Sequence, residues 1–189
     1  MYTYNKNVRS VGTVSGYNNE CISEKLDKTV TNVVKLLERK GWTISTAESC
    51  TGGLLSQLIT SVPGASDVFE LGVCAYSERI KNEILGVPLE DIARYGVVSE
   101  EVALGMVGGL SRISGADICV SVTGIAGPSG GTPEKPVGTV WIGFDIRGDR
   151  FARLPELWKL PDTSRSSIRA AAAEYIFETL VKLLTEEIP

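Results

Sequence analysis

The chain has 189 residues, of which 43% are hydrophobic and 22% are charged, so it is long enough to bury a core without disulfides or metals. Its formal net charge of -4 argues against nucleic acid or an anionic membrane as the main partner, and no stretch approaches the roughly 20 apolar residues of a membrane span. The four cysteines form no C-x-x-C pair and histidine is absent, which excludes the usual structural zinc sites and makes a reducing cytoplasm the simplest compartment.

The N-terminal segment 1–21 has no apolar signal core and is rich in polar residues, which predicts a flexible extension before a single domain over 22–189. Apolar residues then recur with helical spacing from Ile22 to Lys40, and Gly41 is the expected C-cap. A short strand over 42–47, a glycine-rich turn and a second helix follow.

The next segment, 68–76, alternates between apolar and other residues as a half-buried strand does, and a short helix is expected over 78–85. Ser99 should cap a further helix. Cys74 and Cys119 lie in apolar runs and are expected to pack as small core residues. The buried stripe predicted for the helix after Ser99 comprises Val102, Ala103, Met106, Val107, Leu110 and Ile113.

The last third begins with a nearly continuous apolar run, Ile118–Val122, which is typical of a central strand buried on both faces. A loop rich in glycine and proline follows, and then an alternating strand over 140–146 with a turn at 147–149. A further strand is expected over 157–160, and a final helix from Ser164. This order of elements predicts an α/β fold, a three-layer α/β/α sandwich with a mixed sheet.

The turn Ser49-Cys50-Thr51-Gly52-Gly53 joins a predicted strand to a predicted helix. Ser49 is either an N-cap or a nucleophile, and Cys50 is either a buried small residue or a rival nucleophile. Thr51 could cap the helix or touch a ligand. Free backbone N–H groups at Gly52 and Gly53 could hold a phosphate, or the two glycines could merely permit the turn.

A serine nucleophile in a chain without histidine needs another base. Tyr76 ends a predicted strand and Lys81 lies one turn into the next helix, at the strand end where ligands bind in α/β sheets. A desolvated lysine can act as a base, although an ordinary solvated lysine is the alternative. The loop that opens with Thr123 and Gly124 could supply oxyanion or phosphate contacts, or be a surface loop without a role. Lys135, Arg165 and Arg169 could bind a phosphate.

Five motifs in this order and spacing resemble one known family, the C-terminal domain of the competence/damage-inducible protein CinA. They are TAESCTGG (46–53), AYS-x-x-x-K (75–81), LGV (85–87), YGVVSEEVA (95–103) and VTGIAGPSGG…KPVGTVWIG (122–143). The resemblance covers about 22–184. The same domain occurs alone as nicotinamide-nucleotide amidohydrolase, and this chain, without the molybdopterin-binding-like domain of larger members, resembles that form.

The resemblance implies hydrolysis of the carboxamide of nicotinamide mononucleotide to nicotinate mononucleotide and ammonia, with no cofactor or metal. It implies Ser49 as nucleophile, Tyr76 and Lys81 in support of it, and Thr123 as a further site residue. Arg165 is implied in the substrate site, although the family's Gly-Asp-Arg is replaced here by Thr163-Ser164-Arg165. Thr51, Gly52, Gly53 and Gly124 are the other expected substrate contacts. A homodimer is expected, and the alternative function is a nucleotide-binding module without turnover.

Overall fold

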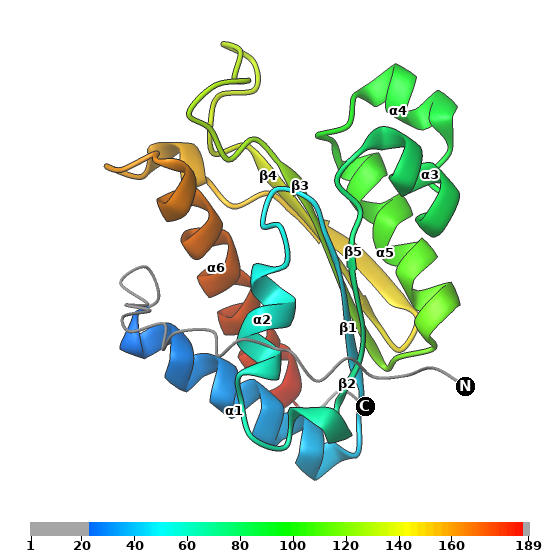
Figure 1. Cartoon of the computed structure of the whole chain (residues 1–189), viewed down its shortest axis with the longest axis vertical. Coiled ribbons are helices and arrows are strands. Elements are labelled where there is room, and N and C mark those ends of the chain that lie inside the picture. The colour runs from blue at the N-terminus through cyan, green and yellow to red at the C-terminus, as the bar shows by residue number, and fades with distance from the viewer. Residues whose placement is uncertain (1–22, 187–189) are drawn as a thin grey trace, which may run out of the picture.

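The computed structural model describes residues 23–186, which form a mixed β-sheet covered by helices on both faces (Figure 1). The strands are β1 Ile44–Glu48, β2 Phe69–Cys74, β3 Ile118–Gly124, β4 Val140–Ile146 and β5 Asp149–Arg153. Their order across the sheet is β2-β1-β3-β4-β5. Strands β2, β1 and β3 are parallel, whereas β4 is antiparallel to β3 and β5 is antiparallel to β4. The mixed sheet predicted from the sequence is confirmed.

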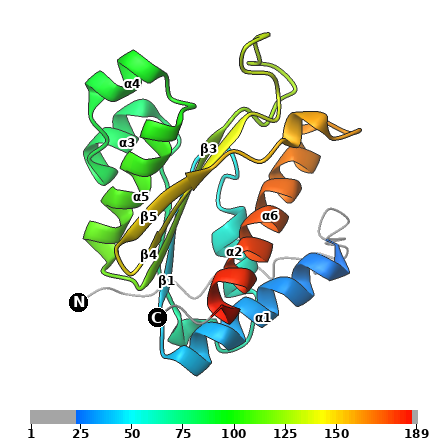
Figure 2. The same ribbon diagram turned by 180° about the vertical axis from the view of Figure 1, so that it is seen from behind.

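The helices form two layers, one on each side of the sheet. They are α1 Glu24–Lys40, α2 Leu54–Thr60, α3 Glu78–Leu85, α4 Leu89–Tyr95, α5 Glu100–Ser114 and α6 Arg165–Thr185, with short 3-10 turns at Ala65–Asp67 and Leu157–Lys159. Helices α1, α2 and α6 lie on one face of the sheet, and α3, α4 and α5 lie on the other, as the two opposite views show (Figures 1 and 2). The three-layer architecture is therefore confirmed.

Local sequence signals set the ends of these helices. The hydroxyl oxygen of Ser23 accepts a hydrogen bond from the N–H of Leu26 at 3.1 Å, and that of Ser99 caps α5 in the same way. Gly41 and Gly86 end α1 and α3 with φ of 64° and 68°, in the left-handed region that costs glycine little. The serines thus set where these helices begin, and the glycines set where they end.

Two hydrophobic clusters hold the layers together. Phe144 and Phe177 belong to the cluster between the sheet and α1, α2 and α6. Met106 belongs to the cluster under α3, α4 and α5. Neighbouring residues Cys119 and Val120 of β3 enter opposite clusters, because side chains alternate across a strand. The prediction that β3 is buried on both faces is confirmed.

Four expectations differ from the structure. The strand expected over 157–160 is a 3-10 turn, and the partner of β4 is instead β5, an exposed edge strand. Helix α4 follows α3 almost at once and was not expected. Cys74 is exposed because it ends the edge strand β2, and Ile113 is 44% exposed near the end of α5, so neither is a core residue. Cys119 is buried as predicted.

The predicted N-terminal extension, 1–21, lies outside the described residues. Over 23–186, none of the helices is long and apolar enough to cross a membrane. The same residues contain no group of three or more metal-ligating side chains that could hold an ion.

Candidate active site

The glycine-rich turn between β1 and α2 places Ser49 at the carboxyl end of the parallel strands. The N–H of Ser49 donates to the carbonyl of Val122 at 3.0 Å, so the turn begins tied to β3. Gly52 and Gly53 have φ of 60° and 93°, which residues with a side chain rarely adopt. The turn brings Ser49 to the sheet edge with 8% of its surface exposed.

The N-terminus of α2 is occupied by a carboxylate of this chain. Glu48 is fully buried, and its oxygens accept hydrogen bonds from the N–H groups of Gly53 (2.9 Å), Leu55 (3.1 Å) and Ser56 (2.9 Å), and from the Ser56 hydroxyl (2.8 Å). The N-cap residue of α2 is Gly53, not Ser49. The anion expected at this helix end is therefore supplied by Glu48, and the side chain of Ser49 is left for another role.

That role is set by Lys81, which lies on α3 with none of its surface exposed. Its Nζ lies 3.0 Å from the Ser49 Oγ. The same nitrogen donates to the backbone carbonyls of Ala75 at 2.8 Å and Tyr76 at 3.2 Å. The alternative of a solvated helix lysine is thus excluded by its burial.

Burial sets the protonation of this amine. Desolvation lowers the pKa of Lys81 below the ordinary value of 10.5, and the partial opposing effects come from Cys50 and Glu78. A neutral lysine amine has two N–H donors and one lone pair. The charged amine has a third N–H, which donates to the Ser49 Oγ. In the neutral form the two carbonyls, which can only accept, would take both N–H groups and leave the lone pair toward the Ser49 hydroxyl, which is the arrangement that a general base requires.

Cys50 is a poor rival for the nucleophile. Its side chain is buried, and desolvation raises the pKa of the thiol to about 12. The thiolate is the reactive form of cysteine, and it is scarce at neutral pH when the pKa is so high. The structure favours Ser49 over Cys50.

A pocket of about 280 Å³ opens beside Ser49. Thr123 and Gly124 end β3 at its wall, and the Thr123 hydroxyl donates to the carbonyl of Val97 at 2.8 Å. Thr123 therefore joins the strand to the segment before α5. The residues that line the pocket are Ser49, Cys50, Tyr76, Val97, Val98, Thr123, Gly124, Ile125, Ala126, Gly127, Ser129, Gly130 and Arg165.

Helix α6 closes one side of this pocket with Arg165. Its Nη1 donates to the carbonyl of Gly127 at 2.9 Å, and its Nη2 donates to the hydroxyl of Tyr76 at 3.0 Å. Tyr76 is 62% exposed, so its ring stands at the pocket mouth while its carbonyl holds Lys81. The structure thus brings together Ser49, Lys81, Tyr76 and Arg165 from three separate segments: the β1–α2 turn, the β2–α3 stretch and α6.

Three expected substrate contacts do not line this pocket. Thr51 is fully buried and its hydroxyl finds no hydrogen-bond partner among the described residues. Gly52 and Gly53 shape the turn, and the N–H of Gly53 is taken by Glu48. Lys135 and Arg169 instead donate to backbone carbonyls, Arg169 to that of Thr51. Sequence reasoning missed the role of Glu48, although an acidic residue just before a glycine turn and a helix is a signal for capping.

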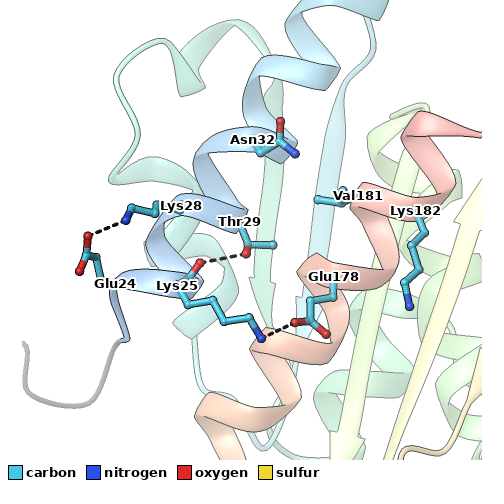
Figure 3. A pocket seen from close by; sticks show the side chains of 8 residues that line it. All are labelled: Glu24, Lys25, Lys28, Thr29, Asn32, Glu178, Val181 and Lys182. Atoms are coloured by element: carbon cyan, nitrogen blue, oxygen red, sulfur yellow. Dashed lines mark hydrogen bonds and ion pairs between the residues drawn. The ribbon is translucent and has the colours of Figure 1, made fainter.

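A larger hollow of about 790 Å³ lies between α1 and α6 (Figure 3). Charged side chains surround it, and they are engaged with one another: Lys25 pairs with Glu178 at 2.7 Å, and Lys28 pairs with Glu24 at 2.6 Å. The hydroxyl of Thr29, which also lines the hollow, donates to the backbone carbonyl of Lys25. The hollow contains none of the predicted site residues and no paired nucleophile and base.

The sequence has relatives of known name. The sequence profile described as CinA C-terminal domain matches residues 26–184. A CinA-like protein of Thermotoga neapolitana is 46% identical over 163 residues, which cover 86% of this chain. Nicotinamide-nucleotide amidohydrolase PncC of Enterobacter agglomerans is 42% identical over 146 residues, or 77% of this chain and 87% of that protein. The chain spans 28% to 38% of the length of the CinA-like relatives from three Thermotoga strains.

Solved structures share the fold. The competence/damage inducible protein CihA of Agrobacterium tumefaciens aligns with a TM-score of 0.81 and 35% identity, over 86% of this chain and 97% of that chain. A CinA superfamily protein of Escherichia coli aligns with a TM-score of 0.79 and 26% identity, over 89% of this chain and 99% of that chain.

Proposed function

The chain belongs to the CinA C-terminal domain family, and on that premise we propose that it hydrolyses the carboxamide of nicotinamide mononucleotide to nicotinate mononucleotide and ammonia. The name of the amidohydrolase relative supports an amidase activity, because that relative is 42% identical and is covered over 87% of its length. The observation that carries the proposal is the contact of 3.0 Å between the Lys81 Nζ and the Ser49 Oγ.

The first half of the proposed reaction forms an acyl-enzyme. Lys81, neutral in its buried position, accepts the hydroxyl proton of Ser49 as the serine oxygen bonds to the carboxamide carbon. The C–N bond then breaks, and the proton on Lys81 passes to the departing nitrogen, which leaves as ammonia. An ester between Ser49 and the nicotinoyl group remains.

The second half restores the enzyme. A water molecule attacks the ester carbon and gives a proton to Lys81, which returns it to the Ser49 oxygen as the ester bond breaks. Each half passes through an oxyanion, and we assign its stabilisation to backbone N–H groups of the glycine-rich β3–β4 loop that lines the pocket. One such donor is typically worth roughly 3 to 4 kcal/mol.

The substrate phosphate needs a cation, since the N-terminus of α2 is already closed by Glu48. Arg165 lines the pocket, and among residues 23–186 its partners are a carbonyl and a tyrosine hydroxyl, so its guanidinium can donate to a phosphate. Thr123 and Gly124 form the wall beside the nucleophile. We therefore assign the phosphate to Arg165 and the carboxamide to the Ser49 end of the pocket.

The direct experiment is to incubate the purified protein with nicotinamide mononucleotide and to measure ammonia. We expect release by the wild type, loss in Ser49→Ala, and turnover within about tenfold of the wild type in Cys50→Ala. If the wild type releases no more ammonia than the Ser49→Ala variant does, the proposed enzymatic activity is refuted. Tight binding of the nucleotide without ammonia would instead establish the alternative, a binding module.

A further inference from the structure

Helix α6 carries two arginines one turn apart, and each holds a different loop of the site. Arg165 binds the Gly127 carbonyl of the β3–β4 loop. Arg169 donates from Nε at 2.9 Å and from Nη2 at 2.5 Å to the carbonyl of Thr51, in the turn that carries Ser49. Neither guanidinium forms an ion pair with a carboxylate of the described chain. Arg169 therefore donates to a backbone carbonyl, and Arg165 donates to a backbone carbonyl and to the Tyr76 hydroxyl.

Several hydrogen bonds hold the backbone of this turn, and the Thr51 carbonyl lies in the middle of them. Before it, the N–H of Ser49 is bound to Val122, and the N–H of Gly52 donates to the Ser49 carbonyl at 3.1 Å. After it, the N–H of Gly53 is bound to Glu48. The Thr51 carbonyl itself accepts from the N–H of Leu54 at 3.3 Å and from two N–H groups of Arg169.

The guanidinium of Arg169 also lies against the turn itself. Its Nη2 would be 3.6 Å from a Cβ built on Gly52, which is van der Waals contact. Arg169 is half-buried and is not among the residues that line the pocket, whereas Arg165 is. The two arginines thus differ in what they face. Arg169 faces the turn over 49–53, here called the nucleophile turn, and Arg165 faces the pocket.

We propose that Arg169 is a positioning residue, which holds the turn so that the Ser49 Oγ meets the Lys81 Nζ, and that it does not bind the substrate. The inference rests on the proposed function for its reaction. A planar fork of two charge-assisted N–H bonds fixes a carbonyl in direction as well as in distance, which a lysine ammonium does not. Displacement of a reacting group by about 1 Å can lower a rate by on the order of 100-fold.

The experiment compares Arg169→Met with Arg165→Met, its matched control on the same helix, and with Arg169→Lys. Two rates are measured: ammonia release from nicotinamide mononucleotide, and labelling of Ser49 by a small fluorophosphonate, followed by intact mass. We expect Arg169→Met to lower kcat and the labelling rate by about 10- to 100-fold, with KM within about threefold of the wild type. Arg169→Lys should recover part of both rates, and Arg165→Met should mainly raise KM.

A rise of KM in Arg169→Met, at wild-type kcat and labelling rate, would overturn the inference and make Arg169 a substrate ligand. If Arg169→Met does not fold, Arg169→Lys decides, and labelling at the wild-type rate in that variant refutes positioning. Labelling of wild-type Ser49 without ammonia release refutes the proposed function, while the labelling rates still judge Arg169. Absence of labelling at Ser49 in the wild type overturns both.

Discussion

Replacing Lys81 with methionine tests the protonation state on which the mechanism depends. The side chain is fully buried, and the described hydrogen-bond partners of its amine are two backbone carbonyls and the Ser49 hydroxyl, none of them a carboxylate. Methionine has a similar length and no charge. The Lys81→Met variant therefore removes the titrating group and keeps most of the buried volume.

The expected effect is a pH-dependent difference in stability. Burial lowers the pKa of Lys81 in the folded protein below the ordinary 10.5 of the unfolded chain. Between these two pKa values the unfolded chain holds a proton on this amine that the folded chain lacks, so the free energy of unfolding rises with pH there. The slope is about 1.4 kcal/mol per pH unit. Over the pH range below 10.5 in which the folded amine is neutral and the unfolded amine is protonated, the wild type gains this amount per pH unit relative to Lys81→Met.

Urea unfolding of both proteins across this range measures the difference, and subtraction cancels the other titrating groups that the two proteins share. Lys35→Met, which changes an exposed lysine of α1, is the control and should give no comparable slope. A wild-type minus Lys81→Met difference that stays flat, or shrinks as the pH rises, would show that the buried amine keeps its proton, and the general-base role would fall.

Two further substitutions test the frame around the site. Glu48→Gln places an amide NH₂ against N–H groups at the start of α2. We therefore expect the free energy of unfolding, measured by urea titration, to fall by about 2 to 4 kcal/mol. An unchanged free energy of unfolding would show that Glu48 does not cap the helix. Gly109→Ala would put a Cβ 1.8 Å from the Leu85 carbonyl of α3, and we expect a loss of about 3 kcal/mol or more. Its control, Gly105→Ala in the same helix, meets no atom closer than 3.4 Å and should be neutral or stabilising, and equal effects of the two alanines would refute the packing argument.

The elements that the sequence predicted are those whose signal is local. A serine followed by an apolar stripe marked the starts of α5 and α6, and Gly41 marked the end of α1. The continuous apolar run of β3 and the alternating pattern of β4 each predicted a strand, and both strands are buried along almost their whole length. In each case the residues that carry the signal are also the residues that make the contacts.

The misses have a common physical cause. Strand β5 reads Asp149-Arg-Phe-Ala-Arg153, with little apolar pattern, because an edge strand is held by the ladder of its neighbour and needs no buried face. Cys74 was expected in the core because its neighbours are apolar, yet burial depends on which strand lies beside β2, and only β1 does. Strand order across the sheet is a long-range property that no local pattern contains.

The nucleophile turn shows the same limit at the candidate site. The glycine-rich turn before a helix predicted a phosphate contact at the helix N-terminus, but the anion that occupies this position is Glu48 of the chain itself. Glu48 lies close enough along the chain to reach that position, and a tethered carboxylate has a much higher local concentration than a free phosphate. The turn is therefore closed from within, and under the proposed function the positive charge for the substrate phosphate has to come from another element. The arginine of α6 that reaches the pocket, Arg165, meets that requirement without disturbing the turn.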